Sequence, residues 1–248
     1  MKTLLLWLNA PLAWGVFLTV SGCNMLLGVL LQLCALPLDP HRRVALWANH
    51  VIWGYGLFAA QPFWAVSRQG IDGLGPGPYV VVCNHSSVLD VPMCLSLPLP
   101  TRVVAKRSLL RVPLMGWYMQ FSRMIALDRG GTPEQTAASM KAFEDTVQSG
   151  LSVLIFPEGT RSEDGSLGTF NRGAFRLSKD LGIPVLPVVV DGTSKVMAKG
   201  KLLPQALSAT FRLRVLEPLD PAPYSTARKM SLRVHERMDA ALSELRAS

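Results

Sequence analysis

Several chemical signatures are missing from this 248-residue chain. It has four cysteines but no C-x-x-C pair, which argues against a zinc ribbon, a dithiol redox centre or a disulfide framework. It has neither a G-x-x-x-x-G-K-[ST] loop nor a G-x-S-x-G elbow, the signatures of P-loop nucleotide binding and of many serine hydrolases. We therefore expect no metal or other cofactor, and reduced, buried thiols in a cytosol-facing domain, at Cys23, Cys34, Cys83 and Cys94.

Acidic residues are also scarce. The chain carries 25 Lys and Arg against 17 Asp and Glu, a net charge of +8, and its mean hydropathy of +0.28 is high for a soluble protein. A basic excess beside apolar segments favours an anionic membrane surface as the partner. The zinc spacings, RNA-binding aromatic signature and basic helical arrays that would indicate nucleic acid are missing, so we expect no nucleic-acid partner.

The first 69 residues contain very little charge. No charged residue occurs from Thr3 to Leu38, a span of 36 positions, and from Val44 to Ser67 His50 is the only residue that can carry a charge near neutral pH. About 20 apolar residues span a bilayer, so the first run is long enough and the second is borderline. The first run is too long for the apolar core of a signal peptide. We expect a membrane-associated two-helix segment over 1–69 and an α/β domain over 70–248.

Two membrane arrangements fit this helical pair, and a buried hairpin of a soluble protein is a third reading. A transmembrane hairpin would send the hinge between the helices across the bilayer, whereas a monotopic pair would lie in one leaflet. The hinge at 39–43 carries Arg42 and Arg43, which favours the monotopic pair because charge is costly within a membrane. Aromatic side chains are then expected near the lipid–water interface. These are Trp7, Trp14, Trp47, Trp53 and Trp64.

Beyond a turn-rich linker at 70–78, short apolar runs alternate with helical patterns. This alternation predicts an α/β fold with a mostly parallel central sheet flanked by helices. Helices are predicted over 133–149, where Thr132 and Gln135 form a capping box, and over about 226–246, which is amphipathic. Strands are predicted at 79–83, 102–106, 124–128, 152–156, 185–190 and 210–216.

A histidine and an aspartate follow the first predicted strand of this domain, in N-H-S-S-V-L-D at 84–90. An imidazole acts as a general base when its second ring nitrogen is held so that the first is aimed at the proton. Asp90 would hold His85 in this way if a turn separated them. The pair alone is weak evidence, because Asp90 is equally suited to cap a helix.

A second polar segment, F-P-E-G-T-R-S at 156–162, follows another predicted strand. Gly159 lets the backbone approach a ligand, Thr160 offers a hydroxyl, and Arg161 offers the planar fork that suits phosphate. Loops that follow parallel strands meet at one edge of the sheet, so we expect both segments in one pocket. Lys106 and Arg129 lie at the ends of two further strands and would add positive charge. Solvent-facing positions are expected instead for Arg102, Arg111 and Arg123.

Together these segments resemble the glycerophospholipid acyltransferases, whose best-known members convert 1-acyl-glycerol-3-phosphate to phosphatidic acid. The H-x-x-x-x-D signature of that family is similar to His85 and Asp90, and its F-P-E-G-T-R-S block matches 156–162 in full. Two further blocks resemble 124–130 and 183–187, and the family's F-K-R-G resembles Phe170 to Gly173 with Asn171 in place of Lys. Many bacterial members also carry an N-terminal apolar helical pair.

The resemblance implies an O-acyltransferase of phospholipid biosynthesis, located in a membrane with its catalytic domain facing the cytoplasm. His85 would deprotonate the acceptor hydroxyl, and Asp90 would orient the imidazole. The donor would be an acyl-CoA or an acyl-carrier protein, and the acceptor a membrane lysolipid. The substrate-binding residues would be Lys106, Arg129, Glu158, Gly159, Thr160 and Arg161.

Three other readings remain open. The family's usual aromatic between His and Asp is absent, and Asn171 replaces a basic residue, which leaves room for another acceptor such as a lyso-aminolipid. A membrane lipid hydrolase could use the same pair to activate water, although no metal ligand set or nucleophile motif supports it. A non-catalytic membrane-associated partner is the third reading, and the presence of both His85 and Asp90 argues against it.

Overall fold

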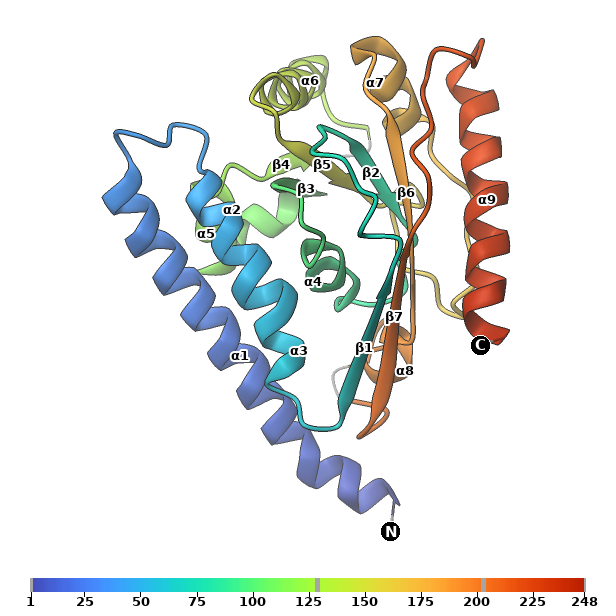
Figure 1. Cartoon of the computed structure of the whole chain (residues 1–248). Helices are drawn as coiled ribbons and strands as arrows, with labels where there is room; N and C mark the ends of the chain where they lie inside the picture. The colour runs from blue at the N-terminus through green and yellow to red at the C-terminus, as the bar shows by residue number, and fades with distance from the viewer. Residues whose placement is uncertain (1, 128–129, 202–203, 248) are drawn as a thin grey trace.

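The protein is a seven-stranded sheet with helices on both faces, as seen in the computed structural model, which describes residues 2–127, 130–201 and 204–247 (Figure 1). The strand order is β1-β7-β6-β2-β5-β3-β4. The five strands from β6 to β4 are parallel to one another, whereas β7 pairs antiparallel to β6 and parallel to β1. The strands are β1 (Trp64–Gln69), β2 (Val80–Cys83), β3 (Thr101–Lys106), β4 (Ile125–Leu127), β5 (Ser152–Ile155), β6 (Val185–Asp191) and β7 (Ala209–Val215). This confirms the predicted α/β fold with a mostly parallel sheet.

The two faces of the sheet carry different helices. In β2, Val81 and Cys83 point to one face and Val80 and Val82 to the other, and each pair joins a separate hydrophobic core. The first core is covered by α1 (Lys2–Ala35), α3 (Leu57–Ala59), α4 (Asp90–Leu95) and α8 (Thr193–Val196). The second is covered by α6 (Pro133–Gln148), α7 (Gly173–Leu181) and α9 (Ala227–Ala247). The remaining helical segments are α2 (Arg43–Ala48), the π-helix η1 (Asn49–Gly56), the 3-10 helix η2 (Arg107–Arg111) and α5 (Met115–Phe121).

The helices α6 and α9 form as their sequences predict. The Thr132 hydroxyl accepts from the backbone N–H of Gln135, whose side chain accepts from the Thr132 N–H, so the capping box at the start of α6 is complete. Gly150 adopts a φ of 70° just after α6, where a residue with a side chain would be strained. Four apolar residues of α9 are fully buried against the sheet, at Met230, Val234, Met238 and Leu242.

Of the expected pair of apolar helices, the structure shows one long helix and not two. Within the described residues, one helix is long and apolar enough to cross a membrane by length and composition, at Trp14–Ala35 in α1. The second run, Val44 to Ser67, is divided among α2, η1, α3 and the first residues of β1. Its inner side packs against α4 and the sheet, and buries Leu46, Leu57 and Phe58. The second run is therefore also part of the globular core.

The tryptophans of this region do not all face outward as expected. Trp47 is exposed, which agrees with an interfacial position. Trp53 points inward, where its indole N–H donates to the Ser21 hydroxyl at 2.9 Å. Trp64 packs edge to face on Phe211 of β7, with 5.1 Å between ring centroids. The prediction for Trp7 lies outside the side chains that the structure describes, and Trp14 lines a cavity described below.

Three further expectations differ from the structure. The strand β1 lies within the apolar run assigned to the membrane segment, and it pairs with β7 in the central sheet. The division into 1–69 and 70–248 itself stays a prediction. Arg102 is buried, not solvent-facing, because its guanidinium donates to the Thr146 hydroxyl and to the His41 carbonyl, each at 2.9 Å. Of the four thiols, Cys83 and Cys94 are buried, whereas Cys23 and Cys34 lie exposed on α1.

Candidate active site

Both sequence motifs lie at the carboxyl edge of the parallel strands. The first begins directly after β2 and the second directly after β5, the strand beside it. Asn84 fixes the start of the first loop, because its side-chain amide donates to the Val190 carbonyl and accepts from the Val190 N–H, each at 2.8 Å. The two loops also bond to each other, since the Ser162 N–H donates to the His85 carbonyl at 2.7 Å. The topology thus brings the two motifs into one site, as predicted.

His85 and Asp90 form the expected pair. The His85 Nδ1 lies 3.0 Å from the Asp90 Oδ2, and the same oxygen accepts the backbone N–H groups of Ser86 and Ser87, each at 2.7 Å. Three donors on one fully buried oxygen stabilise a carboxylate, so the Nδ1 carries the proton and the Nε2 is left to accept one. The imidazole also stacks on Phe156 at 4.0 Å between ring centroids. The geometry therefore suits His85 to act as a general base through Nε2.

Thr193, a residue that the sequence analysis left without a role, completes the surroundings of Asp90. Its side chain is fully buried, and its hydroxyl donates to the Asp90 Oδ1. The two residues are 103 positions apart in the chain, and Thr193 is placed by the turn between β6 and α8. Both oxygens of Asp90 are therefore held, which fixes the carboxylate against rotation. The D-G-T sequence at 191–193 was visible, but no local spacing pattern linked it to Asp90.

Glu158 connects the two loops through its carboxylate. Its Oε1 accepts the His85 N–H at 2.8 Å and its Oε2 accepts the Gly168 N–H at 2.8 Å, while the residue is only 8% exposed. Burial raises the pKa of the Glu158 carboxyl, and these backbone hydrogen bonds act in the opposite direction. Glu158 thus holds the backbone of His85 in place. Its predicted part in shaping the substrate site stays a prediction.

The loop after Glu158 is open. Gly159 adopts a φ of 66° and is exposed together with Thr160, while Arg161 is half-buried. Within the described part of the chain, the Arg161 guanidinium has neither a hydrogen bond nor an ion pair. Asn171 supports this loop from behind, because its side-chain amide donates to the Pro157 carbonyl at 2.9 Å and to the Glu158 carbonyl at 3.2 Å. An arginine on a braced loop with its donors unused is suited to bind an anion.

The two other predicted basic residues differ in what the structure says of them. Lys106 is the last residue of β3 and is exposed at the same carboxyl edge. In the described residues no hydrogen bond or ion pair joins its ammonium to the loop of Arg161. Arg129 lies outside the described residues, so its assignment stays a prediction.

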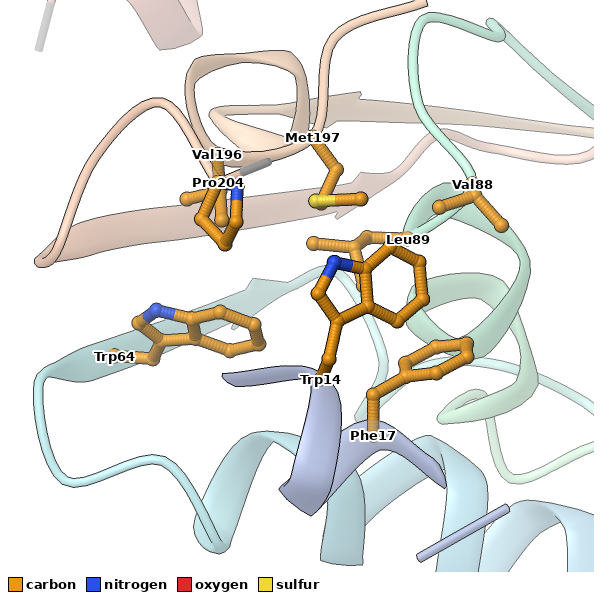
Figure 2. A pocket seen from close by; sticks show the side chains of 8 residues that line it. All are labelled: Trp14, Phe17, Trp64, Val88, Leu89, Val196, Met197 and Pro204. Carbon is orange, nitrogen blue, oxygen red and sulfur yellow. The ribbon is translucent and has the colours of Figure 1, made fainter. Parts of the chain in front are cut away.

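An apolar cavity opens beside the His85–Asp90 pair. It measures about 450 Å³ including its open mouth. Figure 2 shows Trp14 and Phe17 of α1 facing it from one side, and Val196, Met197 and Pro204 from the other. Val88 and Leu89, the residues between His85 and Asp90, contribute its wall, as does Trp64. The Met197 carbonyl accepts from the Ser87 hydroxyl at 2.8 Å, so one segment both lines the cavity and holds the catalytic loop.

The nearby hydroxyls and thiol are engaged in structural contacts. The Ser87 hydroxyl also accepts from the Leu89 N–H at 3.2 Å, and the Ser86 hydroxyl lies 3.5 Å from that of Thr193. Cys83 is fully buried at the end of β2, and burial raises the pKa of its thiol. These environments indicate a structural role for both serines, and they agree with the expectation that Cys83 is a buried thiol.

Among the described residues, no three His, Cys, Asp or Glu side chains gather in a group that would hold a metal ion. The expectation that the protein uses no metal and no cofactor stays a prediction.

Comparison with known sequences places this geometry in a family. A model of the Acyltransferase family matches residues 66–191, about half of the chain. The chain is 33% identical over 205 residues to the chloroplastic 1-acyl-sn-glycerol-3-phosphate acyltransferase BAT2 of Brassica napus, covering 78% of this chain and 57% of the relative. It is 30% identical over 223 residues to the human 1-acyl-sn-glycerol-3-phosphate acyltransferase alpha, covering 86% and 75%. The chain thus spans little more than half the length of its plant relatives but three quarters of the human one.

A solved structure shows the same fold. The 1-acyl-sn-glycerophosphate acyltransferase PlsC from Thermotoga maritima superposes with a TM-score of 0.83 at 23% identity, covering 98% of each chain. The motifs in which the sequence resembles acyltransferases are thus brought together by the acyltransferase fold. From the family match and from the relatives that share 30% or more of its residues over most of its length, the chain belongs to the acyltransferase family.

Proposed function

We propose that this protein is an O-acyltransferase that transfers a fatty acyl group from an acyl thioester to the free hydroxyl of a lysophospholipid, most simply from 1-acyl-glycerol-3-phosphate to phosphatidic acid. The observation that carries the proposal is the fixed His85–Asp90 pair, which lies beside an apolar cavity and next to a loop whose Arg161 has no partner among the described residues. The names of the Brassica and human relatives support this acceptor. The donor would be an acyl-CoA or an acyl-carrier protein.

The pair supplies the proton transfers that the reaction needs. The His85 Nε2 removes the proton of the acceptor hydroxyl while its oxygen attacks the thioester carbonyl. The imidazolium that forms is stabilised by the Asp90 carboxylate, 3.0 Å from Nδ1. When the tetrahedral intermediate collapses, the carbon–sulfur bond breaks and His85 returns the proton to the leaving thiolate. Neither serine nor Cys83 is needed as a nucleophile, so the acyl group passes directly to the acceptor.

The Arg161 loop supplies the site for the acceptor phosphate. A guanidinium binds a phosphate through two parallel charge-assisted hydrogen bonds, and Arg161 has no competing partner among the described residues. Lys106 lies at the same edge of the sheet and adds a positive charge. Asn171, which replaces a basic residue of the family pattern, binds loop carbonyls and so serves the loop's structure. These contacts favour a phosphate-bearing lysolipid over a lyso-aminolipid.

The apolar cavity supplies the site for an acyl chain. Its lining comes from Trp14, Phe17 and six further hydrophobic residues, and its wall includes Val88 and Leu89 beside the base. Transfer of each buried methylene out of water contributes about 0.8 kcal/mol. An acyl chain held there would place its carbonyl carbon near the Nε2 of His85. The cavity thus gives the thioester a defined orientation relative to the acceptor.

The hinge after α1 supports a monotopic arrangement, and we propose that the catalytic domain faces the cytoplasm. The His41 carbonyl accepts from Arg102 at 2.9 Å, its ring Nδ1 lies 2.8 Å from the Ser149 hydroxyl, and the Arg43 guanidinium donates to the Ser149 carbonyl. A transmembrane hairpin would put this hinge across the bilayer from the catalytic domain. Since the hinge is bonded to that domain, the apolar side of α1 would instead lie in one leaflet.

The test is a thiol-release assay on the purified chain in mild detergent, with oleoyl-CoA as donor and 1-acyl-glycerol-3-phosphate as acceptor. We expect thiol release that depends on the acceptor, with phosphatidic acid as the product. His85→Ala should lower kcat by about 10³-fold, since a positioned general base contributes about 10²–10⁴-fold. Thermal unfolding of the variant, followed by circular dichroism, checks that the change acts on chemistry.

The remaining outcomes separate the alternatives. Turnover with an acyl-carrier protein or a lyso-aminolipid alone would retain the reaction and change the substrate. Acceptor-independent thiol release with free fatty acid as the product would replace the transferase by a hydrolase. A folded wild-type chain that is silent with every donor and acceptor would contradict catalysis altogether.

A further inference from the structure

A second apolar surface lies outside the N-terminal helix. Five hydrophobic residues in and around η2 and α5 are exposed, and we refer to them as the 109–117 patch. Leu114 and Trp117 are the most exposed, at 62% and 64%. Leu114 also adopts a φ of 62°, an uncommon backbone conformation for a leucine. The patch consists of Leu109, Val112, Leu114, Met115 and Trp117.

This patch continues the exposed apolar side of α1. The α5 helix packs on α1 where Gly28 meets Tyr118, so closely that a Cβ at Gly28 would lie 2.8 Å from the Tyr118 hydroxyl. The Tyr118 hydroxyl donates to the Asn49 Oδ1 at 2.8 Å, and the Asn24 side-chain amide donates to the same Asn49 Oδ1 at 2.7 Å. These hydrogen bonds tie α1, η1 and α5 together. Exposed leucines flank it on α1, at Leu26, Leu27 and Leu30.

The sequence around the patch is mainly basic. Residues 101–127 contain five Lys or Arg and no Asp or Glu, and one acid, Asp128, follows directly. Arg102 is buried, whereas Lys106, Arg111 and Arg123 are exposed around η2 and α5. Apolar side chains bordered by basic residues match a bilayer with anionic headgroups, because the former enter the acyl region and the latter meet the phosphates. If the partner were a protein, there would be no reason for the exposed apolar surface to continue from the patch onto α1.

We propose that the 109–117 patch is a second membrane-insertion surface, which enters the same anionic leaflet as α1. The inference rests on the membrane association proposed above and adds a separate contact to it. Lys106 immediately precedes η2 at the carboxyl end of β3, so this contact would bring the bilayer to the edge of the sheet that carries the catalytic loops. A lysolipid would then reach Arg161 from the membrane surface without leaving it.

Depth measurements with spin labels test the proposal in the full-length chain bound to vesicles of phosphatidylglycerol and phosphatidylcholine. Single cysteines at Leu30→Cys, Leu114→Cys and Leu232→Cys would carry the label, with the exposed Cys23 and Cys34 replaced by serine. Leu232 is the matched control, because it is 62% exposed, as Leu114 is, but lies on α9 across the sheet. We expect the labels at 30 and 114 to be accessible to oxygen and protected from a water-soluble nickel complex, and the label at 232 to show the reverse.

The three positions separate the two levels of inference. A protected label at 30 with a water-accessible label at 114 would overturn the second surface and leave membrane association standing. Water-accessible labels at both 30 and 114 in the presence of vesicles would overturn the second surface and the membrane association of α1 together. Equal protection at 114 and 232 would indicate adsorption without orientation and would also overturn the proposal.

The basic border gives a second measurement. Arg111→Gln should weaken binding to anionic vesicles roughly fivefold, and leave binding to phosphatidylcholine vesicles unchanged. Arg228→Gln, an exposed arginine on α9, is the matched control and should change neither. Equal losses for the two variants would show that net charge alone governs binding and would contradict a role for this border.

Discussion

The catalytic pair and the arginine loop lie side by side but are built in opposite ways. Around Asp90, both carboxylate oxygens are occupied by four donors, and the residue is fully buried. Around Arg161, the guanidinium has no partner among the described residues and is half-buried. A base must be oriented before the substrate arrives, whereas a binding group must keep its donors available for the substrate. The chain therefore fixes one half of the site and leaves the other half to be completed by the ligand.

The largest effect is expected from breaking the fixed half with Asp90→Asn. The neutral amide cannot stabilise the imidazolium that forms on His85, and an amide NH2 group turned toward Nδ1 would impose the wrong tautomer on the imidazole. We expect kcat to fall by up to about 10³-fold, with the Michaelis constant for the acceptor nearly unchanged. Steady-state kinetics with varied acceptor check this. A loss confined to the Michaelis constant would show that Asp90 serves binding.

Breaking the open half with Arg161→Ala should give the opposite kinetic pattern. Loss of a charge-assisted bidentate contact costs about 1.5–3 kcal/mol, so the Michaelis constant for a phosphate-bearing acceptor should rise by about 10- to 100-fold. The change in kcat should be small. An acceptor without phosphate is the control, because its Michaelis constant should not respond. Equal responses to both acceptors would remove the phosphate assignment.

Thr193 provides a finer test of the fixed half of the site, because it contacts Asp90 but lies outside the 84–90 motif. Thr193→Val keeps the shape of the side chain but removes the donor to the Asp90 Oδ1. We expect kcat to fall about tenfold, and Thr193→Ser to restore most of it. The pH dependence of kcat should also shift for the valine variant, since the carboxylate that stabilises the imidazolium has changed. Loss of thermal stability without any change in the pH profile would indicate a purely structural role.

Glu158 joins the two halves, and the smallest effect concerns its titration. Because burial raises the pKa of Glu158, the folded chain retains this proton at pH values where the unfolded chain releases it. The contribution of Glu158 to stability is therefore greatest below its unfolded pKa and declines as the pH rises through the folded one. Urea unfolding from pH 4.5 to 8 should show the wild type losing stability relative to Glu158→Gln as the pH rises. A constant difference across this range would contradict it.

The sequence predicted those parts of the fold and site that local patterns control. The capping box at Thr132 and Gln135, the alternation of strands with helices, and the adjacency of His85 with Asp90 all depend on residues close in the chain. Contacts across long separations were missed. Thr193 reaches Asp90 across 103 positions, and Arg102 is buried because Thr146 and the hinge at His41 cover it. The strand β1 was hidden because its apolar residues continue a run that already suited a membrane.

Site positions were predictable to the extent that topology places them. His85 and Glu158 follow adjacent parallel strands, so their proximity follows from the fold. The role of Glu158 in holding the His85 N–H depends on the direction of one side chain, which no spacing pattern encodes. The apolar cavity depends on Trp14 and Met197, which come together only when α1 crosses the sheet. Such tertiary contacts lie beyond a reading based on periodicity and motifs.

The bonded hinge between α1 and the second helical run has a mechanical consequence. Because His41 and Arg43 bind Arg102 and Ser149, α1 is attached to the catalytic domain without a flexible linker. With α1 in lipid as proposed, the depth of α1 would set the height of His85 above the bilayer. The bilayer would then set the distance between His85 and the lipid headgroups. A change in bilayer thickness or headgroup size would change which lipid hydroxyl can reach His85.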